Sequence, residues 1–242
     1  VDGKKVASTA DFGADGAVKE KSLKDILLLD EKQATALTES LKNTPLTVKS
    51  MEESPRTERP KPPFSTSTMQ QDAGSRLGWG AQITMRIAQR LYENGYITYM
   101  RTDSINLSEQ ALKAARQAAT ALYGKDHVYE TARLYQGKSK NAQEAHEAIR
   151  PAGDTFKTPG ELAPELSRDE FALYDLIWKR TVASQMADAK KMQMRVDFDA
   201  KTADGKETIF RANGSVITFP GFLAAYDDIA TDENKDEESE DR

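Results

Sequence analysis

A tyrosine within GYITYMRTDS, residues 95–104, has neighbours that could turn it into a nucleophile. Gly95 ends the helical pattern before it, and the β-branched and aromatic residues that follow predict a short strand. Alternate residues of a strand share a face, so Ile97, Tyr99 and Arg101 are expected to point the same way. A phenol has a pKa of ~10, and a neighbouring guanidinium both favours the phenolate and can bind a phosphate oxygen. This pairing suits attack on a phosphodiester.

Spacing alone also leaves two purely structural roles open for this tyrosine. If the helix continued through the stretch, Tyr92, Tyr96 and Tyr99 would form one aromatic stripe in the core. Alternatively, the tyrosine packs beside a structural ion pair between Arg101 and Asp103.

The segment HEAIRP, residues 146–151, contains one of the two histidines of the chain. If the segment is helical, His146 and Arg150 share a face and could together bind a phosphate. The alternative is an exposed helix end that stops at Pro151. No second histidine or cysteine accompanies His146, which argues against a metal site, and His127 has the setting of a surface loop residue.

Hydroxyl and amide side chains are concentrated in PFSTSTMQQ, residues 63–71. Hydroxyls near a helix N-terminus bind phosphate readily, which makes Thr66, Ser67 and Gln70 candidates for DNA contact. Plain helix capping by Thr66 or Ser67 would need only one of these groups. The block 64–101 carries a net charge of +2, which permits contact with DNA without proving it.

Periodicity predicts a mainly helical block between two β-like regions. The expected helices run over 31–42 with Asp30 as N-cap, from Thr66 or Ser67 to Gly78, and over 81–94, 108–123 and 168–187. The two helices that meet at Gly78-Trp79-Gly80 have the pattern of a helix-turn-helix. Strands are expected over 46–53 and from 190 onward, with a hairpin at Asn213–Gly214 and a proline-rich linker over 54–63.

These patterns predict an α+β protein in which a helical domain is inserted into a β-rich domain. The boundaries are 1–62 and 190–230 for the two β-rich pieces and 63–189 for the helical domain, followed by a disordered acidic tail over 231–242. The 16 residues from Asp227 carry a charge of −7, whereas the rest of the chain carries +2, so the net charge of −5 does not exclude a nucleic-acid partner.

Composition narrows the classes of protein further. The chain of 242 residues is long enough to bury a core, and it contains no cysteine, which excludes disulfides and thiolate zinc sites. No apolar run approaches the ~20 residues that cross a bilayer, and no signal-peptide pattern is present. The first residue is Val1 rather than methionine, so we expect a piece of a longer protein.

Three stretches together resemble one enzyme family, the bacterial type IA DNA topoisomerases. They are PPFSTSTMQQDAGSRLGWGAQITMRIAQRLYENGYITYMRTDSINLS, then AQEAHEAIRP, then LYDLIWKRTVASQM. The resemblance runs from about Pro62 to Met186 and more loosely through both flanks. YMRTDS is highly specific to the family, and HEAIRP follows it in the expected order.

The resemblance implies roles for individual residues. Tyr99 matches the nucleophile that forms a 5′-phosphotyrosyl link to one DNA strand, and Arg101 matches the arginine that positions it and the scissile phosphate. His146 matches a histidine that contacts DNA near the cleavage site. DNA contact is also carried over to Arg150, Thr66, Ser67 and Gln70. The family places the tyrosine in a helical, winged-helix-like domain III, which a β-rich arch, domain II, flanks in two pieces.

The same resemblance shows which parts of the family this sequence lacks. No segment matches the Toprim domain, which supplies acidic residues for Mg²⁺ and a lysine near the scissile phosphate, so we expect no cofactor in this piece and no cleavage by it alone. The implied partners are single-stranded or negatively supercoiled DNA and the missing domains of the same chain. A monomer that is cytoplasmic and nucleoid-associated, without a membrane partner, is expected.

Other functions stay open at this point. The chain could be a non-catalytic helix-turn-helix module that prefers duplex DNA, with Tyr99 as a structural residue. It could be a structural hinge piece of a DNA gate that binds DNA weakly by itself. A relative such as topoisomerase III or reverse gyrase shares part of the tyrosine motif.

Overall fold

The computed structural model of the chain describes residues 1–19, 24–135 and 147–226, and it contains both helices and sheets, as expected for an α+β protein. The chain forms two compact units. The first comprises Val1–Arg56 and Met192–Val216, and the second comprises Thr57–Lys191 and Ile217–Arg242. The first unit is therefore built from two stretches that are separated in the sequence by most of the second. The predicted acidic tail, 231–242, lies outside the described residues.

Short elements open the first unit. Strands β1 (Lys5–Val6) and β2 (Ile26–Leu27) pair in parallel, and a 3₁₀ turn, η1 (Thr9–Asp11), follows β1. Helix α1 (Glu31–Leu41) begins after Asp30, whose carboxylate accepts the backbone N–H of Gln33 at 2.7 Å. This confirms the predicted N-cap, because the side chain satisfies one of the free N–H groups of the first turn.

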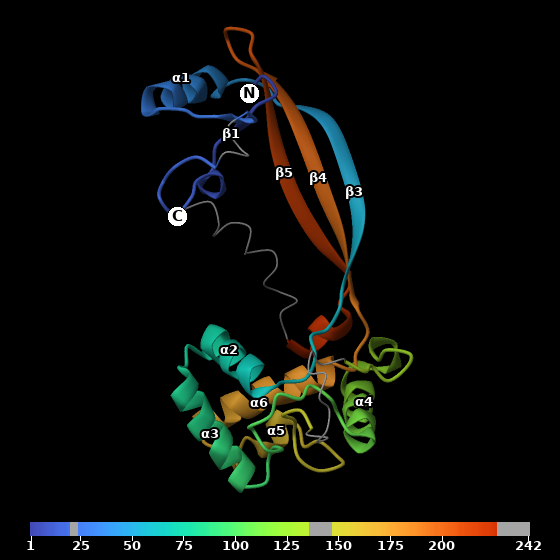
Figure 1. Cartoon of the computed structure of the whole chain (residues 1–242). Helices are drawn as coiled ribbons and strands as arrows, with labels where there is room; N and C mark the ends of the chain where they lie inside the picture. The colour runs from blue at the N-terminus through green and yellow to red at the C-terminus, as the bar shows by residue number, and fades with distance from the viewer. Residues whose placement is uncertain (20–23, 136–146, 227–242) are drawn as a thin grey trace. The chain divides into compact units, whose positions relative to one another are not determined.

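A three-stranded sheet contains β3 (Thr47–Glu58), β4 (Ala189–Lys201) and β5 (Glu207–Phe219), in the order β3-β4-β5 (Figure 1). Two predictions fail here. Strand β3 continues through Pro55 to Glu58 where a linker was expected, which proline permits because β3 is an edge strand.

The predicted hairpin at Asn213–Gly214 is also wrong, because β5 runs through these residues without a break. The chain turns instead between β4 and β5, where Gly205 has φ +86° and the N–H of Thr202 donates to the carbonyl of Lys206 at 3.0 Å. Gly205 adopts the left-handed backbone conformation that a tight turn needs, whereas Gly214 does not.

The second unit is helical. Its helices are α2 (Thr66–Leu77), α3 (Ala81–Glu93), α4 (Glu109–Tyr123), α5 (Pro159–Leu162) and α6 (Arg168–Ala183), with 3₁₀ turns η2 (Lys125–His127) and η3 (Gly221–Tyr226). The N-cap of α2 is Ser65, which directly precedes the two predicted candidates, Thr66 and Ser67. Helix α6 ends four residues earlier than predicted, and the i→i+3 bonds of Gln185 and Met186 tighten the chain beyond it.

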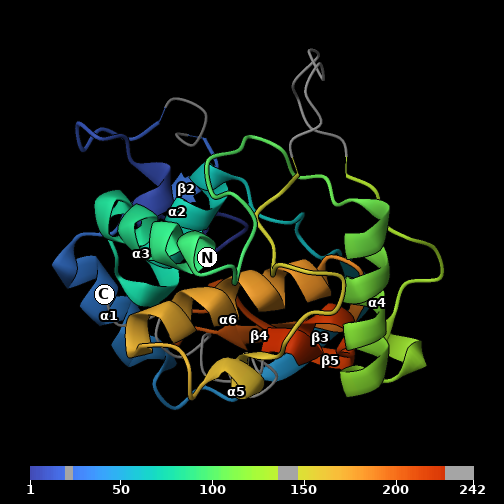
Figure 2. The same cartoon turned by 90° about the horizontal axis from the view of Figure 1, so that it is seen from below.

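Helix α6 forms the centre of the helical core. It contacts α2, α3, α4 and α5, which surround it in Figure 2. Leu173, Ile177 and Val182 of α6 are fully buried, and so is Leu91 of α3, whereas Ile83 at the start of the predicted α3 stripe is 43% exposed. None of the helices in the described part of the chain is long and apolar enough to cross a membrane.

Candidate active site

The chain leaves α3 through a glycine turn that leads directly to the candidate tyrosine. Gly95 has φ +76°, and its N–H donates to the carbonyl of Tyr92 at 2.9 Å. The N–H of Tyr96 donates to the carbonyl of Leu91 at 2.8 Å. These two bonds form a Schellman motif, which confirms that the helix stops at Gly95 and excludes a continuous helix through Tyr99.

The segment after Gly95 is not the strand that the sequence predicts. Only Ile97 forms an isolated antiparallel bridge, to Pro151, and the residues around it are irregular. Ile97 and Met100 are buried, whereas Tyr99 between them is 48% exposed. Ile97 and Tyr99 therefore do not share a face, because the buried side chains follow a spacing of three rather than the two of a strand.

Tyr99 presents its ring at the surface beside α3. The rings of Tyr92 and Tyr99 lie edge to face, with centroids 5.2 Å apart. Tyr96 instead turns away, and its hydroxyl lies 3.0 Å from Glu165, which raises the pKa of Tyr96. Tyr92 and Tyr99 of the predicted aromatic stripe are therefore in contact, but Tyr99 lies outside the helix. Arg101 is exposed as well, two residues after Tyr99.

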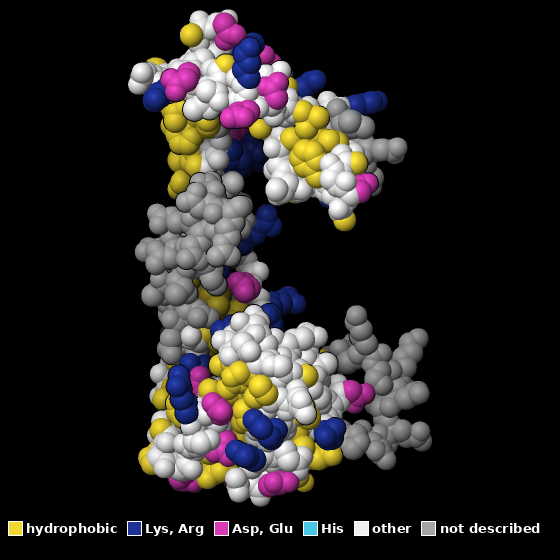
Figure 3. Space-filling model, turned by 90° about the vertical axis from the view of Figure 1, so that its left-hand side faces the viewer, with side chains coloured by type: hydrophobic (Ala, Val, Ile, Leu, Met, Phe, Trp, Pro, Cys, Tyr) yellow, Lys and Arg dark blue, Asp and Glu magenta, His cyan; other side chains and the backbone are white. Residues whose placement is uncertain are grey.

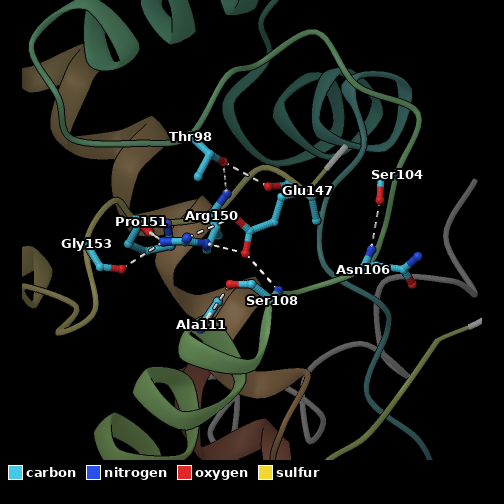
Figure 4. A network of polar contacts seen from close by, with 10 residues as sticks. Thr98, Ser104, Asn106, Ser108, Ala111, Glu147, Arg150, Pro151 and Gly153 are labelled. Atoms are coloured by element: carbon cyan, nitrogen blue, oxygen red, sulfur yellow. Dashed lines mark hydrogen bonds and ion pairs between the residues drawn. The ribbon is translucent and has the colours of Figure 1, made fainter. Parts of the chain in front are cut away.

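Thr98 connects the tyrosine segment, residues 96–102, to the HEAIRP segment through hydrogen bonds (Figure 4). Its hydroxyl donates to the carbonyl of Ala148 at 2.8 Å and accepts the N–H of Arg150 at 3.0 Å. Its own N–H donates to the carbonyl of Arg150 at 2.9 Å. The described residues of HEAIRP, 147–151, are consequently extended rather than helical, which corrects the helical interpretation of this motif.

Arg150 is a buried anchor of this segment. Its guanidinium donates to both carboxylate oxygens of Glu147, at 2.8 and 2.9 Å, and to the carbonyls of Pro151 and Gly153. Four of its five N–H groups are thus bound by protein oxygens, as Figure 4 shows. This arrangement favours a structural role over direct contact with DNA, although the predicted DNA contact of Arg150 itself stays a prediction.

Opposing effects act on the carboxyl group of Glu147. Burial raises its pKa, but hydrogen bonds from Arg150 and from the N–H of Ser108 lower it, and the net pKa lies below the ordinary value. The carboxylate is therefore charged at neutral pH and joins the start of α4 to the HEAIRP segment.

The first turn of α2 contacts the residues that follow Tyr99. The Thr66 hydroxyl lies 2.7 Å from the carbonyl of Met100 and 3.1 Å from that of Thr102. It also accepts the N–H of Thr102 at 2.9 Å. Ser67 is exposed, and Gln70 is half-buried. The fold thus brings Thr66 next to the tyrosine segment, and the DNA contacts predicted for these three residues stay predictions.

Of the two histidines, the structure describes His127 but not His146. His146 lies outside the described residues, so its predicted contact with DNA stays a prediction. His127 belongs to η2 and is half-buried, and its ring lies 5.1 Å from that of Phe219, so it is not an exposed loop residue as expected.

Positive charge is exposed on the helical unit, where Figure 3 shows Lys and Arg side chains on the face turned to the viewer. The four arginines of the block 64–101 are all exposed, namely Arg76, Arg86, Arg90 and Arg101. Among the described residues, no three His, Asp or Glu side chains converge as a metal site would require.

Sequence reasoning missed two residues of this site and the way in which a third contacts Tyr99. Thr98 precedes Tyr99 directly, but nothing in the sequence predicts the bonds that its hydroxyl makes to the 147–151 segment. Glu147 stands three residues before Arg150, a spacing typical of ion pairs in helices, but here the pair forms in an extended segment. The sequence groups Tyr92 with Tyr99 only within a continuous helix, whereas their contact forms across the glycine turn that ends α3.

A protein family and several curated proteins are similar to this chain over nearly its whole length. A family model described as DNA topoisomerase matches residues 5–241. DNA topoisomerase 1 of Mycolicibacterium smegmatis is 52% identical over 243 residues, which cover 99% of this chain and 26% of that protein. DNA topoisomerase 1 of Streptomyces coelicolor is 50% identical, over 100% of this chain and 25% of that protein.

A solved structure agrees with these relatives. Full-length topoisomerase I from Thermotoga maritima matches with a TM-score of 0.63 and 36% identity, over 82% of this chain and 32% of that one. The chain thus spans about a quarter of the length of the curated relatives that it matches. With the family model matched over residues 5–241 and its relatives at half identity or more, the chain belongs to the DNA topoisomerase family.

Proposed function

We propose that this chain is the tyrosine-bearing central part, domains II and III, of a type IA DNA topoisomerase. One observation carries the proposal. The tyrosine of YMRTDS, Tyr99, is half exposed on a backbone that is held on both sides, and Arg101 is exposed two residues later. The helical unit would correspond to the winged-helix-like domain III, and the unit of Val1–Arg56 and Met192–Val216 to the β-rich arch.

The proposed reaction is a reversible transesterification. The Tyr99 oxygen attacks a backbone phosphorus, a bond from that oxygen to phosphorus forms, and the bond from phosphorus to the 3′ oxygen breaks. The phenol gives up one proton and the released 3′ oxygen takes up one, so neither protons nor electrons are consumed. Arg101 would stabilise the charge on the phosphate. Because the ester linkage stores the bond energy, religation needs no ATP.

The whole enzyme would cleave one strand of negatively supercoiled DNA, pass the other strand through the break and religate it. Mg²⁺ would be held by the Toprim domain of the full-length enzyme. We propose that the 242-residue chain alone neither cleaves nor relaxes DNA. The proposed setting is a monomer in the cytoplasm, associated with the nucleoid.

A chimera tests this function directly. Residues of this chain replace the matching segment of the M. smegmatis DNA topoisomerase 1, and the chimera is mixed with a single-stranded oligonucleotide labelled at its 3′ end. The fragment downstream of the cut is then expected to become covalently attached to the protein, and Tyr99→Phe is expected to abolish the adduct.

The same assay separates the alternatives. An adduct that persists in Tyr99→Phe would disprove the assigned nucleophile. Tight binding of duplex DNA by the 242-residue chain, without any adduct in the chimera, would favour the non-catalytic helix-turn-helix module instead. Relaxation of a supercoiled plasmid by the 242-residue chain alone would contradict its proposed inactivity.

A further inference from the structure

We propose that the hydroxyl groups of Thr66 and Thr98 are positioning residues for the Tyr99 nucleophile. The two hydroxyls bind the chain on either side of Tyr99 and determine where its backbone lies. This inference rests on the proposed function, because it concerns the same tyrosine. It assigns no contact with DNA to either threonine.

On the N-terminal side, Thr98 immediately precedes the nucleophile. Its hydroxyl donates to the carbonyl of Ala148 and accepts the N–H of Arg150, so both of its polar functions are used by the segment 147–151. That segment is itself anchored, because Arg150 is held by Glu147 and by two backbone carbonyls. Thr98 thus connects the nucleophile to a fixed support.

On the C-terminal side, Thr66 supplies a hydroxyl from α2. This group lies within hydrogen-bond distance of the carbonyls of Met100 and Thr102 and accepts the N–H of Thr102. The Thr66 N–H also donates to the carbonyl of Thr102 at 2.9 Å. The capping of α2 does not require this hydroxyl, because Ser65 is the N-cap and accepts the N–H of Thr68.

The nucleophile depends on such side-chain bonds because regular structure does not hold it. Residues 98–102 belong to no helix or sheet ladder, and the Tyr99 side chain is half exposed, so core packing does not fix it. Backbone groups outside regular structure are satisfied by side chains or water. A displacement of ~1 Å at a reacting group can cost about 100-fold in rate, so loss of either hydroxyl is expected to slow cleavage.

The test uses the chimera described above with Thr66→Val and Thr98→Val, which keep the side-chain shape and remove the hydroxyl. Thr66→Ser and Thr98→Ser keep the hydroxyl. Thr181→Val is the matched control, because that buried hydroxyl donates to the Ile177 carbonyl within α6. Single-turnover cleavage is measured at saturating oligonucleotide, and affinity is measured separately in the Tyr99→Phe background.

Each valine variant is expected to cleave about 10-fold or more slowly, with an affinity for single-stranded DNA within about two-fold of the parent. The serine variants are expected to recover most of the rate, and Thr181→Val to keep it. A parental rate in folded valine variants would overturn the proposal, as would serine variants that are as slow as valine. A loss of affinity that explains the slower cleavage would overturn it too, since that outcome indicates DNA contact.

A second measurement needs no activity. Amide hydrogen exchange in the 242-residue chain is expected to speed up across residues 98–102 in the valine variants and to stay unchanged there in Thr181→Val. Unchanged exchange would refute the positioning role even if the chimera were inactive. If the valine variants speed exchange in the 242-residue chain as expected but the chimera forms no Tyr99 adduct, the proposed function is refuted and the hydroxyls are structural bonds only.

Discussion

The rings of Tyr92 and Tyr99 lie edge to face, with planes inclined by 67° and centroids 5.2 Å apart. Tyr92 is in the last turn of α3, and Tyr99 follows the glycine turn that ends this helix. Both residues are exposed by 40% or more, so the contact forms at the surface of the helical unit. The edge of one ring against the face of the other restricts the positions that Tyr99 can adopt.

A double-mutant cycle measures this contact. Tyr92→Ala, Tyr99→Ala and the double variant are expected to show a coupling of about 0.5–1.5 kcal/mol, the range found for aromatic pairs. Denaturant unfolding is followed by tryptophan fluorescence, because both tryptophans, Trp79 and Trp178, lie in the helical unit. Tyr92→Phe, which keeps the ring, is the control. Additive effects of the two alanine substitutions would contradict the contact.

Glu147→Gln tests the buried ion pair with Arg150. At neutral pH the free energy of unfolding of the helical unit is expected to fall by about 1–2 kcal/mol, because hydrogen bonds to a charged partner are lost. The folded-state pKa of Glu147 is lowered from 4.5, so its stabilisation is present above that value and is lost as the pH falls through the lower folded pKa. The difference between wild type and variant should therefore close below pH 4.5.

Glu130→Gln is the control for this experiment, since Glu130 is an exposed glutamate of the same unit. It is expected to change the free energy of unfolding by less than about 0.5 kcal/mol at any pH. A difference between wild type and Glu147→Gln that stays constant from neutral to acidic pH would show that the carboxylate charge is not what stabilises the pair.

Gly221 begins η3 at a position that no side chain fits. It has φ +51°, and a Cβ atom there would lie 2.6 Å from the carbonyl oxygen of Ala187 and would also collide with that of Asp188. Gly221→Ala is expected to destabilise the helical unit by about 2–4 kcal/mol through strain and overlap. In α5, Gly160→Ala meets no atom within 4 Å and is expected to be neutral or slightly stabilising. Equal unfolding midpoints for the two variants would contradict this assignment.

Asp197 in β4 is held by arginines on the sheet. Hydrogen bonds from Arg211, at 2.7 and 2.9 Å, are the main cause that lowers the pKa of Asp197 to about 2, and burial opposes them. The resulting stabilisation is present above the ordinary value of 3.8 and disappears as the pH falls through about 2. Asp197→Asn is therefore expected to speed amide exchange in β4 and β5 at neutral pH, with a smaller effect at the acid limit.

Asp199→Asn is the matched control in the same strand. Asp199 pairs with Lys49 at 3.1 Å, but both side chains are nearly half exposed, and surface ion pairs contribute little. Exchange in β4 should be unaffected by this change. If both variants accelerated exchange equally, the pair of the buried Asp197 and the exposed Arg211 would have no special role.

Local sequence signals predicted the helices well and the connecting segments poorly. Asp30 and Ser108 cap their helices as expected, and Gly78 and Gly95 end theirs, because a cap or a left-handed glycine acts on groups only a few residues away. The strand propensity of residues 96–101 was overridden, since these residues make one isolated bridge, from Ile97 to Pro151, and belong to no sheet.

The sequence by itself predicted α1, α2, α3, α4 and the start of α6, and its family resemblance identified Tyr99 as the candidate nucleophile. Only the tertiary structure decided how that tyrosine is presented. The Thr66 hydroxyl meets a carbonyl 34 residues away, and the Thr98 hydroxyl meets one 50 residues away. Bonds over such separations depend on how α2, α3 and the 147–151 segment pack together, and no pattern of neighbouring residues encodes that packing.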